Sequence, residues 1–271
     1  MMKRGVFAAV LALALLVIAS PAVAQISDAA GVGGTAINGV AGGVVDLYDQ
    51  LGIPPAGNGA PDQNFEAGFD TYDAEGADDF IVTFPQGWVV QQVETTGTQS
   101  TGGTATSVDV TFYADDSGFP GAAPVSGCEF LGVVPTTQNL GAFVIDLPTD
   151  CNLPPGAYWV AIITNQDFAG GNGQHFWSNS TSQVNNGGVW RNPGDGFGSG
   201  CTDWDRMTTC GVGGGTNPDF LFAVRGQEGI PGFGDAGPNP LEIPTLDLFG
   251  LLALFALLGG AALILLRRRS A

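Results

Sequence analysis

From Phe65 onward, the chain alternates short runs of β-branched and aromatic residues with clusters of Gly, Pro, Asp and Asn. In the clearest run, SVDVTFY at 107–113, Val108, Val110 and Phe112 alternate with polar residues. Because successive side chains of a strand point to opposite faces, these three residues should face a core and the polar ones solvent. The sequence ADDSGFPG follows directly and has the composition of a tight turn.

Further runs of the same kind predict about nine strands, and no stretch shows the pattern of an amphipathic helix. This pattern favours an all-β fold, an antiparallel β-sandwich with jelly-roll-like topology. A β-barrel or two separate small domains are the alternatives. The predicted strands are 79–84, 88–95, 107–113, 129–134, 142–147, 157–164, 174–178, 188–191 and 220–225.

The segments on either side of this region have a different composition. Residues 25–64 are rich in Gly and Ala and predict a loose lead-in, with one strand or helical turn around 44–51. Residues 227–242 are rich in Gly and Pro and predict a spacer that cannot bury enough apolar surface to fold. The β-sandwich domain is therefore expected over 65–226.

The N-terminus has the form of a secretory signal peptide. Lys3 and Arg4 precede an apolar run at 5–20, and Ala22-Val23-Ala24 offers the small residues that a signal peptidase recognises. Cleavage before Gln25 would remove residues 1–24. An uncleaved membrane helix is the alternative, but the apolar run is short and ends at a cleavage motif.

The C-terminus predicts a transmembrane helix. Residues 248–266 are nineteen residues without a charge, and at about 1.5 Å per residue they match the hydrocarbon thickness of a bilayer. Arg267, Arg268 and Arg269 follow and would stop transfer on the cytoplasmic side. The folded domain is then expected outside.

The residues just before this helix, Ile243, Pro244, Thr245 and Leu246, complete a recognisable tail over 243–271. This tail resembles the IPTL-CTERM sorting signal, a relative of the PEP-CTERM tails that exosortase-like membrane transpeptidases process in Gram-negative bacteria. The resemblance implies a single-pass inner-membrane intermediate, cleavage of the tail, and a final place at the cell surface or outside the cell. Proteins with tails of this class are usually exported proteins of organisms that make extracellular polysaccharide and biofilm. The tail implies nothing about the domain, because it follows many unrelated domains.

The charge of the chain is uneven. Five of the eight basic residues lie in the two terminal segments, so only Arg191, Arg206 and Arg225 face 26 acidic residues. A surface of this kind repels phosphate backbones and excludes a nucleic-acid partner.

Four cysteines, Cys128, Cys151, Cys201 and Cys210, lie in the exported part. Export and an even count predict two disulfides, with three possible connectivities. The pairs 128–151 and 201–210 are favoured because each closes a local loop. A zinc site is the alternative, but the chain contains no Cys-x-x-Cys.

The stretch DTYDAEGADDF carries Asp70, Asp73, Glu75, Asp78 and Asp79 within ten residues. Carboxylate oxygens on loops are the ligands that calcium prefers, although the spacing matches no EF-hand. Calcium is therefore the one cofactor that the sequence suggests, on the basis of clustering alone.

Three tryptophans lie among Asn, Asp and Gly in the region around 175–205. Aromatic faces beside amide and carboxylate groups are typical of sugar-binding sites. Trp177 is expected in the core, whereas Trp190 and Trp204 are candidates for an exposed glycan-binding site. The alternative is that all three lie in the core.

Evidence for catalysis is weak. His175 is the only histidine, no Gly-x-Ser-x-Gly motif accompanies it, and a half-buried strand histidine is the simpler interpretation. The leading hypothesis is a non-enzymatic exported protein of the cell surface or extracellular matrix. The alternatives are a carbohydrate-binding module or adhesin on the same scaffold, which would bind extracellular polysaccharide, and a hydrolase that uses acidic residues.

Overall fold

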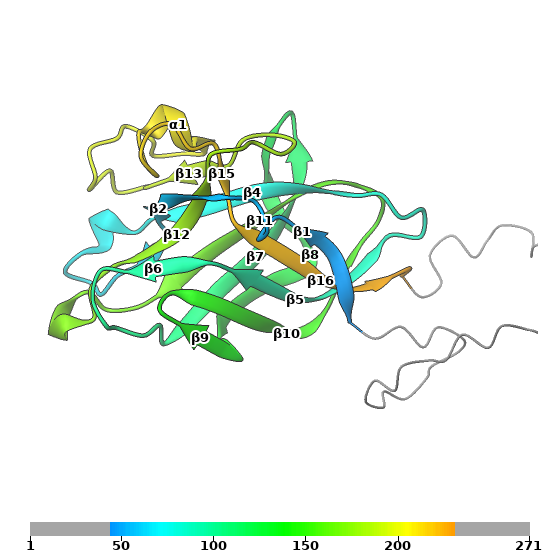
Figure 1. The fold of residues 1–271 in the computed structure, drawn as a ribbon, viewed down its shortest axis with the longest axis horizontal. Helices are drawn as coiled ribbons and strands as arrows, with labels where there is room; N and C mark the ends of the chain where they lie inside the picture. The colour runs from blue at the N-terminus through cyan, green and yellow to red at the C-terminus, as the bar shows by residue number, and fades with distance from the viewer. Residues whose placement is uncertain (1–43, 231–271) are drawn as a thin grey trace, which may run out of the picture. The chain divides into compact units, whose positions relative to one another are not determined.

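The computed structural model describes residues 44–230, whose strands form two facing layers (Figure 1). The first layer is a sheet with the order β14-β13-β4-β11-β7-β8, and β3 pairs with β11 in parallel. The strands of this layer are β3 (Gln63–Asn64), β4 (Glu75–Val82), β7 (Ser107–Asp116), β8 (Phe119–Val133), β11 (Gly156–Asn165), β13 (Val189–Arg191) and β14 (Asp205–Arg206).

The second layer is an antiparallel sheet with the order β1-β16-β5-β10-β9. Its strands are β1 (Val45–Asp49), β5 (Trp88–Thr95), β9 (Thr137–Asn139), β10 (Ala142–Leu153) and β16 (Phe222–Glu228).

A third, small sheet continues the second layer past a bend. Its strand β6 follows β5 directly, and its strand β15 precedes β16. Backbone hydrogen bonds among Thr96, Ser178 and Leu221 connect the two sheets at the bend. The strands of this sheet are β2 (Pro55–Pro61), β6 (Gly97–Gln99), β12 (His175–Ser180) and β15 (Asp219–Phe220).

The main core lies between the layers. Val108, Val110 and Phe112 of β7 are fully buried, as the alternation predicts. On the facing layer, Val93 and Ile145 are buried in the same cluster. The predicted antiparallel β-sandwich is therefore confirmed, and all described residues fall within one compact unit.

A smaller apolar cluster covers the outer face of the first layer, and we call it the outer cluster. The Arg206 guanidinium lies over it, 4.5 Å from the ring centroid of Phe119 and 5.7 Å from that of Trp159. Thr111, expected at a solvent-facing position, is buried beside this cluster, because it pairs with Ala161 across β7 and β11. The buried members of the outer cluster are Ala77, Tyr113, Trp159, Ala161 and Val189.

The sequence predicted the strands with alternating patterns but missed several others. Residues 88–95 form β5 as expected, and β1 lies where one strand or helical turn was predicted around 44–51. The strands β2 and β3, within the rest of the predicted loose lead-in, were not expected. The sequence of β2, PAGNGAP, carries no alternation. Its conformation is set by pairing with β12, as in the register of Ala60 with Trp177. The sandwich therefore begins about twenty residues earlier than predicted.

The predicted signal peptide, sorting motif and helix at 248–266 lie outside the described residues. Among residues 44–230, no helix has the length and apolar character needed to cross a membrane.

Both predicted disulfides are present. Cys128 on β8 bonds to Cys151 on β10 and so joins the two facing layers covalently. The second bond, Cys201–Cys210, joins the end of a loop to the short helix α1 (Met207–Cys210).

A buried charge pair connects the three sheets. Nδ1 of His175, on β12, lies 2.6 Å from the carboxylate of Asp62, which follows β2. Nε2 donates to the carbonyl of Gly141, beside β10, at 2.8 Å. The hydroxyl of Thr164 on β11 lies 3.0 Å from Nδ1. Because a backbone carbonyl and an ionised carboxylate only accept hydrogen bonds, this geometry fits a charged imidazole with a proton on each nitrogen.

The expectation of a half-buried histidine was wrong, since His175 is 1% exposed. Burial alone would lower the pKa of His175, but the charge and hydrogen bond of Asp62 outweigh it, and the pKa is raised. The folded chain therefore holds this proton more tightly than the unfolded chain. The resulting stability is complete below the unfolded pKa of about 6.5, and it is lost as pH rises through the folded pKa.

We expect His175→Gln to lower the free energy of unfolding by about 3–5 kcal/mol at pH 6, because the carboxylate of Asp62 loses its buried cation. Urea unfolding measures this difference. The gap between the wild type and the variant should narrow as pH rises through the folded pKa of His175. A gap that is absent at low pH, or constant across the range, contradicts a charged pair.

Candidate functional site

Three loops come together at one end of the first layer. Asn64 and Asn165 pair in parallel at the ends of β3 and β11. The loops that follow these strands, 65–73 and 166–174, therefore begin side by side. The pairing of Arg191 with Glu75 brings the loop at 192–200 to the same end.

These loops carry an exposed group of aromatic side chains, which we call the aromatic cleft. The ring centroids of Phe69 and Phe168 are 5.6 Å apart, and those of Tyr72 and Phe197 are 5.3 Å apart. All four rings remain between 36% and 44% exposed. Adjacent rings that stay this exposed form an apolar surface patch, and such patches are candidates for interaction sites. The aromatic members of the cleft are Phe65, Phe69, Tyr72, Phe168 and Phe197.

The cleft contains two adjoining hollows that share Phe69 and Phe168. One has a volume of about 420 Å³ and is also lined by the hydroxyl residues Ser100 and Thr101. The other has a volume of about 260 Å³ and is lined by Gln174. The Nε2 of Gln174 is buried without a hydrogen-bond partner among the described residues.

A carboxylate fastens two of the loops together. Glu66 accepts hydrogen bonds from the backbone N–H groups of Phe168, at 2.7 Å, and Ala169, at 3.0 Å. Desolvation raises the pKa of Glu66, but the backbone N–H donors outweigh it and hold the pKa below its usual value. Glu66 therefore remains ionised, and Phe168 keeps its place beside Phe69.

The third loop docks through backbone contacts with the first. Asn192 donates from its side chain to the carbonyls of Thr71 and Asp73, at 2.8 Å each. The N–H of Gly196 donates to Thr71 at 2.7 Å. A Cβ on Gly196 would lie 2.5 Å from the carbonyl oxygen of Thr71, so only glycine permits this approach. Phe197 is thereby placed against Tyr72.

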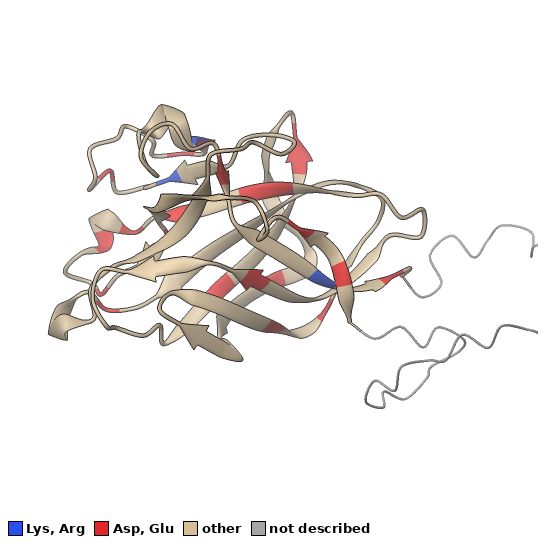
Figure 2. Ribbon diagram, viewed as in Figure 1, with Lys and Arg blue, Asp and Glu red and all other residues tan. Residues whose placement is uncertain are grey.

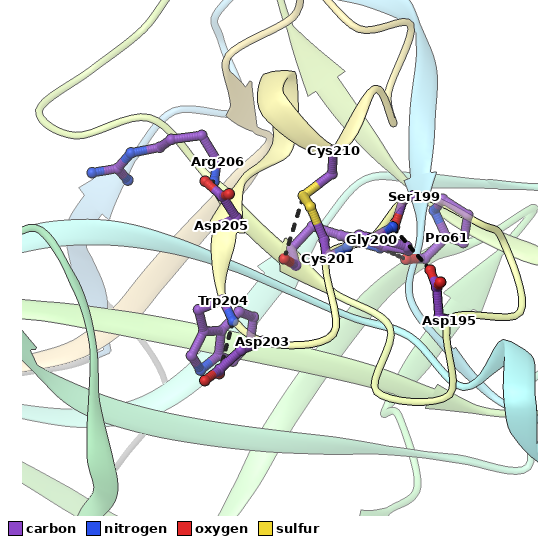
Figure 3. Close-up of a disulfide and its surroundings, with 11 residues drawn as sticks. Pro61, Asp195, Ser199, Gly200, Cys201, Asp203, Trp204, Asp205, Arg206 and Cys210 are labelled. Carbon is purple, nitrogen blue, oxygen red and sulfur yellow. Dashed lines mark hydrogen bonds between the residues drawn. A yellow bond between two sulfur atoms is a disulfide. The ribbon is translucent and has the colours of Figure 1, made fainter.

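The disulfide Cys201–Cys210 closes the far end of this loop, as Figure 3 shows. Asp195 accepts from the N–H of Gly200 at 2.9 Å within the same loop. The disulfide and this hydrogen bond together hold the segment that carries Phe197.

Trp190 does not form an exposed sugar-binding surface, and that prediction was wrong. Its side chain is fully buried, and its Nε1 donates to the carbonyl of Pro61 at 2.6 Å. Strand alternation explains the difference, because Val189 and Arg191 face outward and Trp190 therefore faces the core. Its ring packs edge-on against Phe197, with the ring centroids 5.9 Å apart. Trp190 therefore supports one ring of the cleft without being exposed in it.

Trp204 lies on the outer face of the first layer and not in the aromatic cleft. The Arg191 guanidinium covers one face of its ring at 4.2 Å, and Tyr113 meets it edge-on. The structure therefore does not bring Trp190 and Trp204 together into one site.

The five acidic residues predicted to bind calcium are dispersed, and the described residues contain no group of side chains suited to a metal ion. Asp78 accepts from the N–H of Phe220 on the core side, whereas Asp79 accepts from Asn186 on the outer side. Glu75 pairs with Arg191. Adjacent residues of a strand point in opposite directions, so clustering in β4 does not produce clustering in space.

The other two predicted calcium ligands lie in the loop at 65–73. Asp70 is exposed on the short helix η1 (Asp70–Tyr72), and Asp73 accepts from the N–H of Phe65 at 2.8 Å. Asp73 therefore shapes the loop that carries three of the cleft aromatics.

A pair of buried carboxyl groups holds the loop at 181–188. Desolvation raises the pKa of Asp79 to about 6 and that of Asp219 to about 7. Both accept hydrogen bonds from this loop, Asp79 from Asn186 and Asp219 from Val184 and Gly188. Their acceptor groups are thus engaged in structural contacts.

The aromatic cleft was not predicted from the sequence, although a signal was present. Phe69, Phe168 and Phe197 occur in GFD, DFA and DGFG, where an aromatic residue is surrounded by Gly and Asp in a predicted loop. A large apolar side chain in such a context has no strand to bury it.

We expect Gly196→Ala to separate the third loop from the first and to destabilise the protein by about 1–3 kcal/mol, a usual cost of overpacking. Gly68→Ala is the matched control, because a Cβ there meets nothing within 4 Å. Thermal unfolding measures stability, and hydrogen exchange of residues 192–200 measures docking of the loop. Equal behaviour of the two variants contradicts the close approach.

No family model matches the sequence, and no curated protein matches it. One solved structure is similar, that of the cysteine protease and lectin-like domains of Cwp84, a surface layer associated protein of Clostridium difficile. The likeness has a TM-score of 0.42 and 11% sequence identity, and it covers 57% of this chain and 32% of that chain. The chain therefore spans about a third of the length of that structure. At this level the likeness assigns neither fold nor function.

Proposed function

We propose that the protein is a non-enzymatic, carbohydrate-binding protein of the bacterial cell surface or extracellular matrix. In this proposal the aromatic cleft holds part of a polysaccharide chain. The observation that carries the proposal is the set of adjacent, partly exposed rings of Phe69, Tyr72, Phe168 and Phe197.

The chemistry of the cleft supports a sugar ligand. Pyranose rings have apolar faces, formed by C–H groups, that stack on aromatic rings, and hydroxyl edges that need hydrogen-bond partners. The cleft offers both kinds of group, since the polar residues Ser100, Thr101 and Gln174 line the same hollows as the aromatic rings.

The environment of His175 supports binding rather than catalysis. Its Nε2, the atom that a general base would use, donates to the carbonyl of Gly141 and is buried. A general base must reach a substrate proton within hydrogen-bond distance. His175 instead forms structural contacts with Asp62 and Gly141 in the interior of the sandwich.

The scaffold in this proposal is a jelly roll. The chain passes through β1, β4, β5, β7, β8, β10, β11 and β16. These eight strands form the orders β1-β16-β5-β10 in one layer and β4-β11-β7-β8 in the other. An eight-stranded double sheet with such interleaved order is the arrangement of two Greek keys that defines the jelly roll, an architecture common in lectin domains.

Export is part of the same proposal. Two disulfides form and persist in oxidising compartments, which supports a role outside the cytoplasm. The signal peptide at 1–24 and the IPTL-type tail at 243–271 would deliver the domain, with removal of the tail by an exosortase-like transpeptidase.

Carbohydrate binding is tested by calorimetric titration of the purified protein with soluble polysaccharides, including those of its host. We expect Phe168→Ala and Phe197→Ala each to weaken binding about tenfold, or about 1.4 kcal/mol. Ile81→Ala removes an apolar side chain of similar exposure from the opposite end of β4 and should leave binding unchanged. Equal affinities of all three variants and the wild type contradict the cleft as the site.

Processing of the tail is tested by the intact mass of the mature protein purified from its host. We expect a mass that lacks Arg267, Arg268 and Arg269, because cleavage near the Pro-containing motif releases the helix. A mature chain that keeps these arginines contradicts the processed tail and leaves a permanent membrane anchor.

A further inference from the structure

We infer that the ligand of the aromatic cleft is a cationic polysaccharide, built from amino sugars whose amino groups are free and protonated. This inference rests on the proposed carbohydrate-binding function and names the chemical class of its ligand. It combines the aromatic cleft with the distribution of charge around it.

Each of the three cleft loops carries an exposed acidic residue within two positions of a cleft ring in the sequence. Asp70 follows Phe69, Asp167 precedes Phe168, and Asp195 lies two residues before Phe197. All three carboxylates are on exposed residues. Figure 2 shows acidic segments on η1 and on the loop after β13. Three separate loops therefore converge on the same combination of a ring and a negative charge.

The positive charges of the domain are engaged elsewhere. Residues 44–230 contain three arginines and no lysine. Arg191 pairs with Glu75, and Arg225 pairs with Asp46 and Glu94. Neither arginine lines the cleft.

The remaining arginine, Arg206, donates to the carbonyls of Gly118, at 2.7 Å, and Gly187. It lies over the outer cluster, against Phe119 and Trp159. The buried imidazolium of His175 is neutralised by Asp62. The loops that form the cleft therefore carry exposed negative charge, and no arginine lines the cleft to offset it.

This charge distribution decides among polysaccharide classes. A uronic acid polymer would bring its carboxylates to the loops that carry Asp70, Asp167 and Asp195, and like charges near one another repel. A neutral polymer would gain stacking and contacts with the polar lining residues, but no attraction from the carboxylates. An ammonium group gains attraction from the carboxylates, and it is also attracted to the faces of the aromatic rings within about 6 Å. Both the aromatic rings and the negative charge of the cleft loops are thus complementary to a free amino sugar.

The test compares three soluble oligosaccharides of equal length against the purified protein. They are a β-1,4-linked glucosamine oligomer, its fully N-acetylated counterpart, and a uronic acid oligomer. We expect the glucosamine oligomer to bind at least about tenfold more tightly than the N-acetylated one at low salt. This preference should shrink at about 1 M salt, where the screening length falls to about 3 Å.

The triple variant Asp70→Asn, Asp167→Asn, Asp195→Asn should lose the preference while it still binds the N-acetylated oligomer. Asparagine at 195 retains an acceptor for the N–H of Gly200. The matched control is the triple variant Asp116→Asn, Glu129→Gln, Asp150→Asn, which removes three exposed charges from β7, β8 and β10. It should keep the preference at low salt.

The outcomes separate the inference from the proposal on which it rests. Equal affinities for the glucosamine and N-acetylated oligomers, or tightest binding of the uronic acid oligomer, overturn the inference but leave carbohydrate binding intact. An undiminished preference in the cleft triple variant also overturns it, because the preference then arises elsewhere. If none of the three oligomers nor any host polysaccharide binds, both the inference and the proposed function fail.

Discussion

The arrangement of the sheets depends on the buried pair of His175 and Asp62. A charged imidazole in an apolar interior is stable only where every polar atom is satisfied, and here the partners come from different sheets. Asp62 follows a strand of the small sheet, Gly141 precedes one of the second layer, and Thr164 lies in the first layer. The pair therefore fixes how the layers meet, which non-directional apolar packing alone leaves less defined.

The same polar network continues to the floor of the aromatic cleft. The N–H of His175 donates to Gln63, whose side chain donates to the carbonyl of Gln166 at 2.6 Å. Gln166 exchanges side-chain hydrogen bonds with Gln99. Gln174, with its unpartnered Nε2, immediately precedes His175. This hydrogen-bonded interior holds in place the loops that expose the aromatic rings of the cleft. Such preorganisation limits the conformational entropy lost when a ligand binds.

Alternation of apolar and polar residues predicted strands such as β5 and β7, because side chains alternate between the two faces of a strand and this pattern is visible in the local sequence. The first half of β8 and all of β2 lack that period, and their conformation depends on partners that the sequence does not reveal. Both disulfides were predicted from loop closure. The face on which Trp190 lies depends on its register with β4, and the separation of Asp78 from Asp79 follows from their being in a strand. The cleft itself required knowing that three distant loops meet.

The most direct test of the account is a backbone NMR titration of the purified protein with a glucosamine oligosaccharide. The account predicts chemical-shift changes confined to the loops at 65–73, 166–174 and 192–200, together with Ser100, Thr101 and Gln174. The amides around Trp204 and Asp79 on the outer face should remain unchanged. Shifts concentrated on that outer face would contradict the aromatic cleft as the binding site, and no shifts at the highest ligand concentration would contradict a free amino sugar as its ligand.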